Sequence, residues 1–285
     1  MTSDRFERQL PFLTTEGQRR LHAARLAVVG VGGLGSHVVQ QLACTGVTTL
    51  SLIDQDRVEV TNLNRLVTAT PADIGLLNVD VLRRFVLSLH PDAAIQSVRT
   101  ELRSDEAYAA VQAADYVIGC VDDDGPRFLL TQLAAAYRKP YMDLSSEIGE
   151  DRTSYGGKMV FSRSGEGCLV CRGLLDDREI RSWLETPEER RTRDRIYGQR
   201  VDAQTGSGPS VVALNGVVAS IAVMELMLEI AGVRPALEFR EYHGVYGIVA
   251  APQDRGPAPR DCRICSEVCG QGHDADLERF IREKP

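Results

Sequence analysis

The chain has 285 residues, and 43% of them are hydrophobic, which is enough for the core of one large α/β domain or two small ones. The formal net charge of −7 argues against a general nucleic-acid-binding surface. The first ten residues are charged and lack the apolar core of a signal peptide. No stretch reaches the roughly 18 uninterrupted apolar residues of a membrane helix, so the sequence predicts a cytoplasmic protein with no membrane segment.

The first elements are a polar helical segment over residues 4–25 and a buried parallel strand from Leu26 to Val29. A G-x-G-x-x-G turn follows at once. Its first glycine permits the tight turn, its second lets the backbone approach a phosphate, and its third lets the next helix pack on the sheet. That helix is expected to run to about Cys44, with its positive N-terminal end towards the phosphate. The glycines of the turn are Gly30, Gly32, Gly33 and Gly35.

A second strand is predicted over residues 48–53, and it ends in Asp54 and Asp56. A carboxylate at this strand tip is placed to accept hydrogen bonds from ribose hydroxyls. A glycine pattern alone can mark no more than a tight turn, because many α/β domains need glycines there. The preceding strand, the following helix and the acidic tip together favour a nucleotide site.

The segment Val60-Thr61-Asn62-Leu63-Asn64-Arg65 resembles the S-N-L-x-R segment of the ubiquitin-activating-enzyme-like adenylyltransferases, the ThiF/MoeB/HesA family. The doubled glycine and the D-x-D tip belong to the same pattern, and the resemblance extends over residues 4 to about 266. It implies an α/β fold with a Rossmann-like, doubly wound, mostly parallel sheet extended by later strands. It also implies ATP and Mg²⁺.

Arg5 and Arg8 on their own would be a solvated helix face. The R-x-x-R-Q opening of many family members, however, implies that Arg8 reaches a nucleotide phosphate in the partner subunit's site, and therefore that the protein is a homodimer. The nucleotide-binding residues implied by the resemblance are Gly30, Gly32, Gly33, Gly35, Asp54, Asp56, Asn62, Arg65, Asn78 and Asp122.

A helix predicted over residues 71–90 carries a departure from the family pattern. Family members have G-x-P-K here, with a lysine that contacts the ATP phosphates, whereas this chain has Gly75-Leu76-Leu77-Asn78. Asparagine donates a hydrogen bond without charge, and a charge-assisted bond is about twice as strong as a neutral one. Either Arg83 or Arg84 could compensate for the absent lysine.

The next elements are a strand over 93–98, a helix over 104–113 and a buried strand, Tyr116 to Cys120, which opens into three acids. Acids at the carboxyl end of a parallel strand lie where ligands of α/β proteins bind. They can also be a solvated helix cap. The resemblance to the family's C-T-D-N segment assigns Asp122 to Mg²⁺. A helix over 127–138 and a strand over 141–145 repeat the pattern.

After a strand at residues 156–161, two C-x2-C pairs stand 91 residues apart. In a reducing compartment, two such pairs suit a structural, four-coordinate zinc site. A redox dithiol would need only one pair, near the first βα turn. We therefore predict that zinc ties the C-terminal tail to the body through Cys168, Cys171, Cys262 and Cys265.

Residues 173–209 are the expected crossover loop, which in the family passes over the substrate's C-terminal tail. Thioester-forming members often keep a nucleophilic cysteine there, and this stretch has none. Cys44 and Cys120 are expected to be inert and buried, and Cys269 to be a spare thiol. A core helix over 211–231 and strands over 237–242 and 246–250 complete an adenylation domain of residues 1–252, followed by a tail of residues 253–285.

The resemblance predicts an ATP-dependent adenylyltransferase in which Arg8, Arg65 and Asp122 act on the phosphates and metal. Its expected partner is a ubiquitin-like or sulfur-carrier protein that ends in glycine, with a conjugating-enzyme-like protein as a further candidate. The absence of the family lysine at Asn78 leaves a second possibility, an impaired family member that serves as a binding scaffold. A third, an NAD-dependent oxidoreductase, shares only the glycine turn with this chain.

Overall fold

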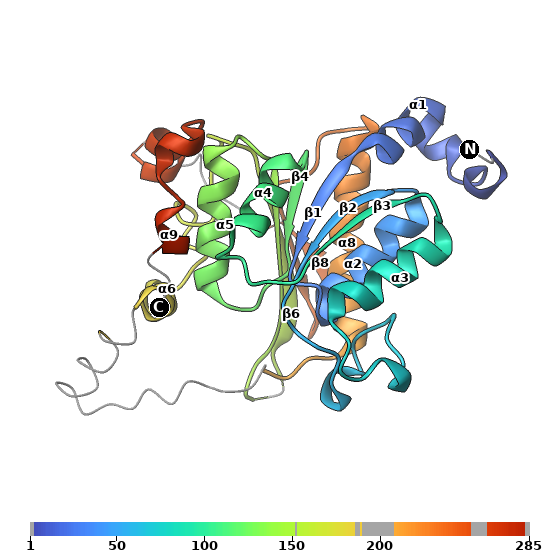
Figure 1. Cartoon of the computed structure of the whole chain (residues 1–285), viewed down its shortest axis with the longest axis horizontal. Helices are drawn as coiled ribbons and strands as arrows, with labels where there is room; N and C mark the ends of the chain where they lie inside the picture. Colours follow the sequence, from blue (N-terminus) through green and yellow to red (C-terminus); the bar gives the residue numbers. More distant parts are fainter. Residues whose placement is uncertain (1–2, 152, 186–188, 190–207, 252–260, 283–285) are drawn as a thin grey trace.

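A computed structural model describes residues 3–151, 153–185, 189, 208–251 and 261–282. Its centre is an eight-stranded sheet in the order β3-β2-β1-β4-β5-β6-β7-β8 (Figure 1). Strands β3 to β5 in that order are parallel, and β6, β7 and β8 continue the sheet antiparallel. The strands are Arg25–Val29 (β1), Thr49–Ile53 (β2), Ala94–Val98 (β3), Tyr116–Gly119 (β4), Tyr141–Ile148 (β5), Tyr155–Ser162 (β6), Phe239–His243 (β7) and Ile248–Ala250 (β8).

The parallel half has the expected Rossmann-like order. Apolar runs form its buried centre, where Leu26 of β1 pairs with Leu50 of β2, and β1 is flanked on its other side by β4. The chain order of the strands reverses between β1 and β4. In open α/β sheets this reversal leaves a crevice at the carboxyl ends of the strands, where ligands bind.

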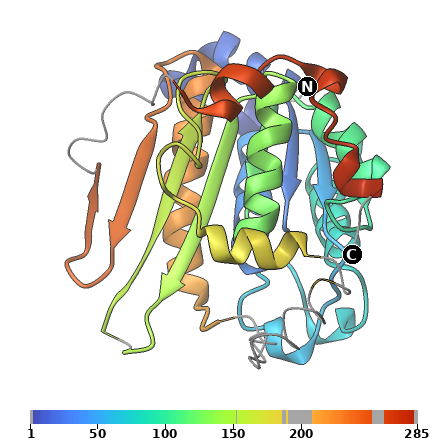
Figure 2. The ribbon, with the colours of Figure 1, turned by 90° about the vertical axis from the view of Figure 1, so that its left-hand side faces the viewer.

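Helices cover both faces of the sheet (Figure 1). Four of them pack on one face: α1 (Leu10–Ala23), α2 (Gly33–Thr45), α3 (Asn78–Leu89) and α8 (Val212–Ala231). The opposite face carries α4 (Asp105–Ala113) and α5 (Asp124–Ala136), with the short α6 (Asp177–Leu184) lying across one end of α5 (Figure 2). The sheet thus separates two hydrophobic clusters.

The long helix α8 is apolar enough to span a membrane by length and composition, but 61% of that window is buried inside the protein. Its two glutamates are both paired with arginines of the protein. Glu225 accepts hydrogen bonds from Arg234 at 2.7 and 2.8 Å, and Glu229 pairs with Arg163 at 2.8 Å. In this protein α8 is a core helix, as predicted.

Three predicted helices differ from the structure. The helix expected over residues 71–90 is wrong at its start: a 3₁₀ turn, Pro71–Asp73, is followed by Gly75 with φ +90°, and α3 begins only at Asn78. The positive φ breaks the helix and lets Leu77 form a β-bridge with Arg57. Helix α5 begins at Asp124 rather than 127, and the N-terminal segment is broken at Thr14.

The C-terminal tail packs against α4 and α5. It contains a helical turn at Ile264–Val268, a 3₁₀ turn at Gly272–Ala275 and the short α9 (Arg279–Arg282). Leu277 is buried, and its carbonyl accepts a hydrogen bond from Tyr108 Oη at 3.0 Å. Ordinary packing therefore also holds this tail, beside the zinc site that the sequence predicts.

Candidate active site

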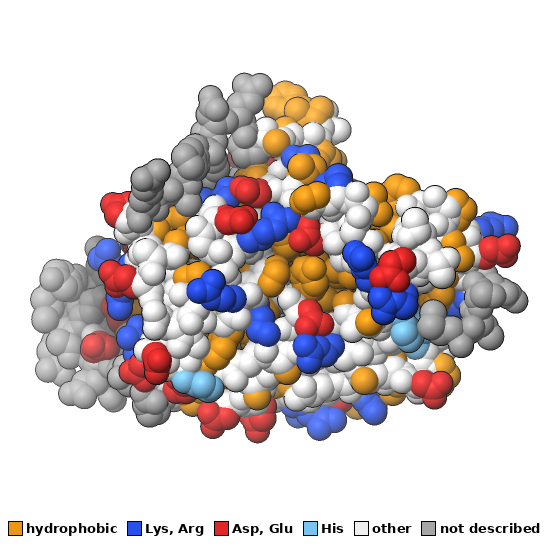
Figure 3. Space-filling view, turned by 90° about the horizontal axis from the view of Figure 1, so that it is seen from above, with side chains coloured by type: hydrophobic (Ala, Val, Ile, Leu, Met, Phe, Trp, Pro, Cys, Tyr) orange, Lys and Arg blue, Asp and Glu red, His pale blue; other side chains and the backbone are white. Residues whose placement is uncertain are grey.

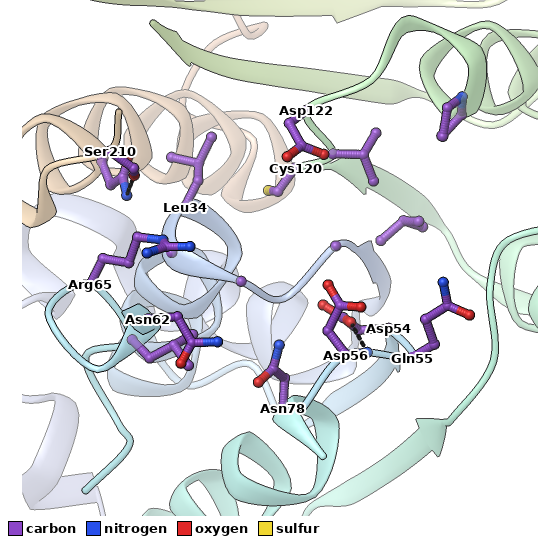
Figure 4. A pocket seen from close by; sticks show the side chains of 18 of the residues that line it. Leu34, Asp54, Gln55, Asp56, Asn62, Arg65, Asn78, Cys120, Asp122 and Ser210 are labelled. Atoms are coloured by element: carbon purple, nitrogen blue, oxygen red, sulfur yellow. Dashed lines mark hydrogen bonds between the residues drawn. The ribbon is translucent and has the colours of Figure 1, made fainter. Parts of the chain in front are cut away.

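A cleft of about 660 Å³ opens at the carboxyl ends of β1, β2 and β4, at the crevice where the strand order reverses (Figure 4). It brings together residues that lie far apart in the sequence. Among the predicted nucleotide-binding residues, those that line the cleft are Gly30, Gly32, Gly33, Asp54, Asp56, Asn62, Arg65, Asn78 and Asp122.

Gly35 lies outside the lining, because its role is to let α2 approach β1. A Cβ atom on Gly35 would stand 2.0 Å from the carbonyl oxygen of Gly30. No side chain fits at that distance. The third glycine of the turn is therefore required by helix packing, as the motif predicts, and not by contact with a ligand.

Asp54 connects the end of β2 to the glycine turn. Its Oδ2 accepts a hydrogen bond from the Val31 N–H at 2.8 Å, and its Oδ1 accepts one from the Asp56 N–H at 2.7 Å. Burial raises the pKa of Asp54, and hydrogen bonds from these two amides and from the Asn78 side chain oppose the rise. These three donors use three of the roughly four lone-pair sites of the carboxylate, so one site is left for a further donor, such as a ribose hydroxyl.

Asp56 and Asp122 face each other across the cleft from the ends of β2 and β4 (Figure 4). Partial burial raises the pKa of Asp56, and the negative charges of Asp122 and then Glu59 raise it further. Two carboxylates that repel each other are suited to a shared divalent cation. Their hard oxygen atoms fit Mg²⁺, which is commonly held by one or two carboxylates together with substrate phosphates.

The loop that carries Arg65 is folded by Asn62. The Asn62 Oδ1 accepts a hydrogen bond from the Glu59 N–H at 2.9 Å, and its Nδ2 donates to the Arg57 carbonyl at 3.2 Å. Arg65 donates from Nη1 to the Thr61 carbonyl at 2.9 Å. Asn62 thus lines the cleft but also has a structural function, which is to hold the loop that presents Arg65.

Asn78 is buried at the first turn of α3. Its backbone N–H donates to the Asp56 carbonyl at 2.9 Å, and its side chain hydrogen bonds with Asp54. Neither Arg83 nor Arg84 lines the cleft, and Arg84 pairs with Asp73 at 2.6 Å. The two arginines therefore do not take the place of the absent lysine in this structure.

Arg8 and the cleft lie at opposite ends of α2. Gln9, the neighbour of Arg8, donates to the carbonyl of Thr45 at 3.0 Å, at the last residue of α2, whereas the glycine turn stands at the first. The 13 residues of α2 separate its two ends by about 20 Å at 1.5 Å per residue. The end of the molecule that carries Arg8 faces the viewer in Figure 3, where basic and acidic side chains are interspersed. Arg8 cannot contact a nucleotide in the cleft of its own chain.

The four predicted zinc ligands meet at one point. The sulfur atoms of Cys168, Cys171, Cys262 and Cys265 all lie within 4.8 Å of one another, and Cys168 Sγ is 3.7 Å from Cys262 Sγ. A tetrahedral site with Zn–S bonds of about 2.3 Å has sulfur–sulfur edges of about 3.8 Å. Burial raises the pKa of Cys265 to about 12 and that of Cys168 further. A bound cation would convert these thiols to thiolates.

A sequence model of the ThiF family matches residues 6–264. The chain belongs to the ThiF family. It is 34% identical over 172 residues to an Aspergillus fumigatus protein named adenylyltransferase and sulfurtransferase uba4, a match that covers 59% of this chain and 35% of the relative. It is 36% identical over 139 residues to the sulfur carrier protein adenylyltransferase of Thermus thermophilus, covering 48% of this chain and 51% of that one. The chain thus spans about a third to a half of the length of these relatives.

Solved structures of E. coli MccB share the fold. One, in complex with MccA-N7isoASN, has a TM-score of 0.70 and 19% identity, and the match covers 95% of this chain and 75% of MccB. These comparisons confirm the family and the mixed α/β sheet that the sequence predicts. Adenylyltransferase, the enzyme class expected for the chain, is the class that the names of its ThiF-family relatives carry.

The described part of the predicted crossover loop of this ThiF-family chain is anchored beside the cleft. The Asp176 N–H donates to Asp124 Oδ2 at 2.6 Å, and Arg127 bridges Asp124 to the buried Asp143. This network was not predicted from the sequence. The i,i+3 spacing of Asp124 and Arg127 is compatible with an ion pair between them, but only the fold brings Asp143 close to them.

Helix α6 is also held by its tryptophan. Trp183 lies against Gly125, where a Cβ atom would stand 2.2 Å from the indole. Arg103 stacks on its ring at 3.5 Å from the centroid and donates to its carbonyl at 2.9 Å. The remainder of the loop, residues 186–188 and 190–207, lies outside the described residues, including most of the stretch that was compared with the nucleophilic-cysteine segment of thioester-forming family members.

The remaining cysteines do not form a second cluster among the described residues. Cys120 lines the cleft at the end of β4, and burial raises its pKa, which makes the thiol a poor nucleophile. Cys44 is exposed at the last turn of α2, so the prediction of a buried position is wrong. Cys269 is half-buried beside the zinc-ligand pairs.

Proposed function

We propose that this chain is an adenylyltransferase that transfers AMP from Mg·ATP to a carboxylate. The carboxylate oxygen attacks the α-phosphorus of ATP, the bond from that phosphorus to the β-phosphate oxygen breaks, and pyrophosphate leaves with the electron pair. One observation carries the proposal. The glycine turn, the ribose-facing Asp54, the acid pair Asp56 and Asp122, and Arg65 line a single cleft.

Each group has a role that follows from its chemistry. Asp54 would orient the ribose, and the N-terminal amides of α2 would face the phosphates, where the helix end favours negative charge. Arg65, with Arg8 of a second copy of the chain, would stabilise the phosphate charge. Asp122 with Asp56 would hold Mg²⁺, which neutralises phosphate charge when it is bound. These preorganised charges would supply most of the rate enhancement.

The proposed substrate is the C-terminal glycine carboxylate of a ubiquitin-like or sulfur-carrier protein, in a bacterial protein-conjugation or sulfur-transfer pathway. The names of the relatives support this class, since one is a sulfur carrier protein adenylyltransferase and another is an adenylyltransferase and sulfurtransferase. A homodimer is part of the proposal, because Arg8 can reach a cleft only in another chain. A conjugating-enzyme-like protein is the proposed acceptor of the adenylate.

One observation favours a second function, that of a scaffold which binds the carrier without adenylating it. Asn78 replaces the expected lysine, and its side chain faces Asp54. A scaffold would bind ATP or the carrier but release no pyrophosphate. The predicted zinc site is compatible with either function.

Exchange of labelled pyrophosphate into ATP tests the proposal. Candidate carriers that end in glycine are mixed with the protein and Mg·ATP, and the matched control is the same carrier without its terminal glycine. We expect exchange that depends on the intact terminus. ATP binding without exchange for any carrier would favour the scaffold. Binding of neither ATP nor AMP would overturn both functions.

A further inference from the structure

Three side chains from separate segments form a hydrogen-bonded set on one wall of the cleft. The Ser146 hydroxyl, on β5, donates to Asn215 Oδ1 at 2.8 Å, and Asn215 Nδ2 donates to Ser210 Oγ at 3.1 Å. Asn215 is only 1% exposed, yet it contributes to the cleft lining together with Ser146 and Ser210. In this arrangement the amide oxygen of Asn215 faces Ser146 and the amide nitrogen faces Ser210.

This set meets Arg65 at the first residue of α2. A Cβ atom on Gly33 would stand 2.8 Å from Asn215 Nδ2 and 2.9 Å from Arg65 Cδ, so the amide and the arginine converge on the space that only a glycine leaves free. Figure 4 places Ser210 beside Arg65, on the other side of the glycine turn from Asp54 and Asp56. The cleft therefore has an acidic end and an end rich in hydrogen-bond donors.

The donor-rich end suits a multiply charged anion. Arg65 brings a positive charge, α2 brings its N-terminal amides, and Asn215 brings a buried amide with a second N–H beyond the one given to Ser210. Ser210 accepts from Asn215, and its own hydroxyl proton meets no acceptor among the described residues.

We propose that Asn215 and Ser210 bind the β- and γ-phosphates of ATP, the pyrophosphate that leaves in the reaction. This inference rests on the proposed function. With the ribose at Asp54, the phosphate chain would run along the glycine turn and end at Arg65, Asn215 and Ser210. The substrate carboxylate must approach the α-phosphorus from the side opposite the leaving group, which places it away from this end of the cleft.

Ser146 is a positioning residue in this arrangement, since it acts through the Asn215 amide. Neutral donors here would also offset part of the missing lysine charge, because Asn78 faces Asp54 instead of the phosphates. Hydrogen bonds to a charged group contribute more than neutral ones, so each donor would change ATP affinity about tenfold.

Calorimetric titration separates this role from others with three probes: α,β-methylene ATP with Mg²⁺, inorganic pyrophosphate and AMP. We expect Ser210→Ala to weaken α,β-methylene ATP and pyrophosphate about tenfold each and to leave AMP affinity unchanged. Ser210→Thr, which keeps the hydroxyl, should retain the wild-type affinities. Ser220→Ala on α8, the helix that carries Asn215, is the control, because Ser220 lies outside the cleft lining.

Two further variants test the amide. Asn215→Asp keeps the shape and places a carboxylate against the phosphates, so it should weaken α,β-methylene ATP more than Ser210→Ala does, again with AMP spared. Ser146→Ala should lower the ratio of ATP affinity to AMP affinity and should leave the melting temperature close to that of the wild type.

Equal weakening of AMP and ATP, or wild-type affinity in both Ser210→Ala and Asn215→Asp, would overturn the inference. The proposed function fails differently, because a wild-type protein that binds neither AMP nor ATP refutes the adenylyltransferase itself. An effect of Ser210→Ala on carrier-dependent exchange, with ATP affinity unchanged, would assign the hydroxyl to the carboxylate substrate and also overturn the inference.

Discussion

The nucleotide cleft and the four-cysteine cluster are assembled in opposite ways. In the cleft, protein hydrogen bonds already fix the functional groups, since both oxygens of Asp54 accept backbone N–H groups of the turn and the strand tip. In the cluster, four thiols from two segments 91 residues apart face one another, and the backbone N–H groups that donate to Cys168, Cys171 and Cys262 bring no compensating positive charge. The cleft is preformed by the chain, whereas the cluster needs a cation to balance its thiolates.

This difference implies that ligand removal has different consequences in the two regions. Loss of the nucleotide should leave the cleft folded, because backbone contacts hold it. Loss of the metal should loosen the segments that carry the cysteines, although packing of Leu277 against α4 retains part of the tail.

The largest effect is expected for Asp122→Asn, which should abolish carrier-dependent pyrophosphate exchange because the metal loses an anionic ligand. The same change should raise the melting temperature of the ligand-free protein at pH 7. Burial and then the charge of Asp122 raise the folded-state pKa of Asp56, so ionised Asp56 destabilises the fold above its unfolded pKa. The stability gain should vanish in acid, below the unfolded pKa of about 3.9. Unchanged exchange would remove Asp122 from the mechanism.

Gly35→Ala should disrupt the glycine turn itself. Its Cβ would overlap the Gly30 carbonyl at 2.0 Å, and overpacking of this kind typically costs about 1–3 kcal/mol. We expect a lower melting temperature and loss of ATP binding by calorimetry. Gly32→Ala is the matched control, because a Cβ there meets no atom within 4 Å. It should keep the melting temperature and weaken only the nucleotide, and an equal melting loss in both variants would contradict this reading.

The metal prediction concerns the other region. Fresh, unchelated protein should contain about one zinc per chain, according to the four-ligand rule. Cys265→Ser should lose the zinc and expose the tail to limited proteolysis while ATP affinity stays unchanged. Protein purified without any zinc would reject the site. A parallel loss of ATP affinity would show that the two regions are not independent.

The smallest effect is expected for Asn78→Lys. A lysine side chain is longer than that of asparagine and would bring a positive charge towards the phosphates, and the gain of a charged hydrogen bond corresponds to about tenfold in exchange rate. The measurement is carrier-dependent exchange at saturating Mg·ATP. A wild-type protein at least as fast as the variant would mean that the introduced lysine pairs with Asp54 and that Asn78 does not limit the reaction.

Features carried by contiguous residues could be predicted from the sequence. The glycine turn, the acidic tip of β2 and the C-x2-C pairs each lie within a few residues, so their chemistry follows from spacing alone. The start of α3 was missed because the conformation of Gly75 depends on the bridge between Arg57 and Leu77. Neighbours along the chain give no signal for such a contact.

The set Ser146, Asn215 and Ser210 was missed for a related reason. Its members come from β5, α8 and the end of the crossover loop, and each alone resembles an ordinary polar residue. Only the sheet order brings β5 and α8 together beside the glycine turn. The expectation for Cys44 was also wrong, because an apolar helix sequence does not tell which residue of its last turn faces solvent.

The packing of Trp183 has a spectroscopic consequence. It is the only tryptophan of the chain. Its indole lies between the guanidinium of Arg103 and Gly125, and Gly125 is on α5, which begins just after Asp122. Its fluorescence therefore comes from one place, the junction between α6 and α5. If a bound nucleotide or carrier lifts α6 from α5, the indole loses its arginine and becomes hydrated, and its emission shifts to longer wavelength. The chain thus contains its own optical probe of the contact between α6 and α5, with no label required.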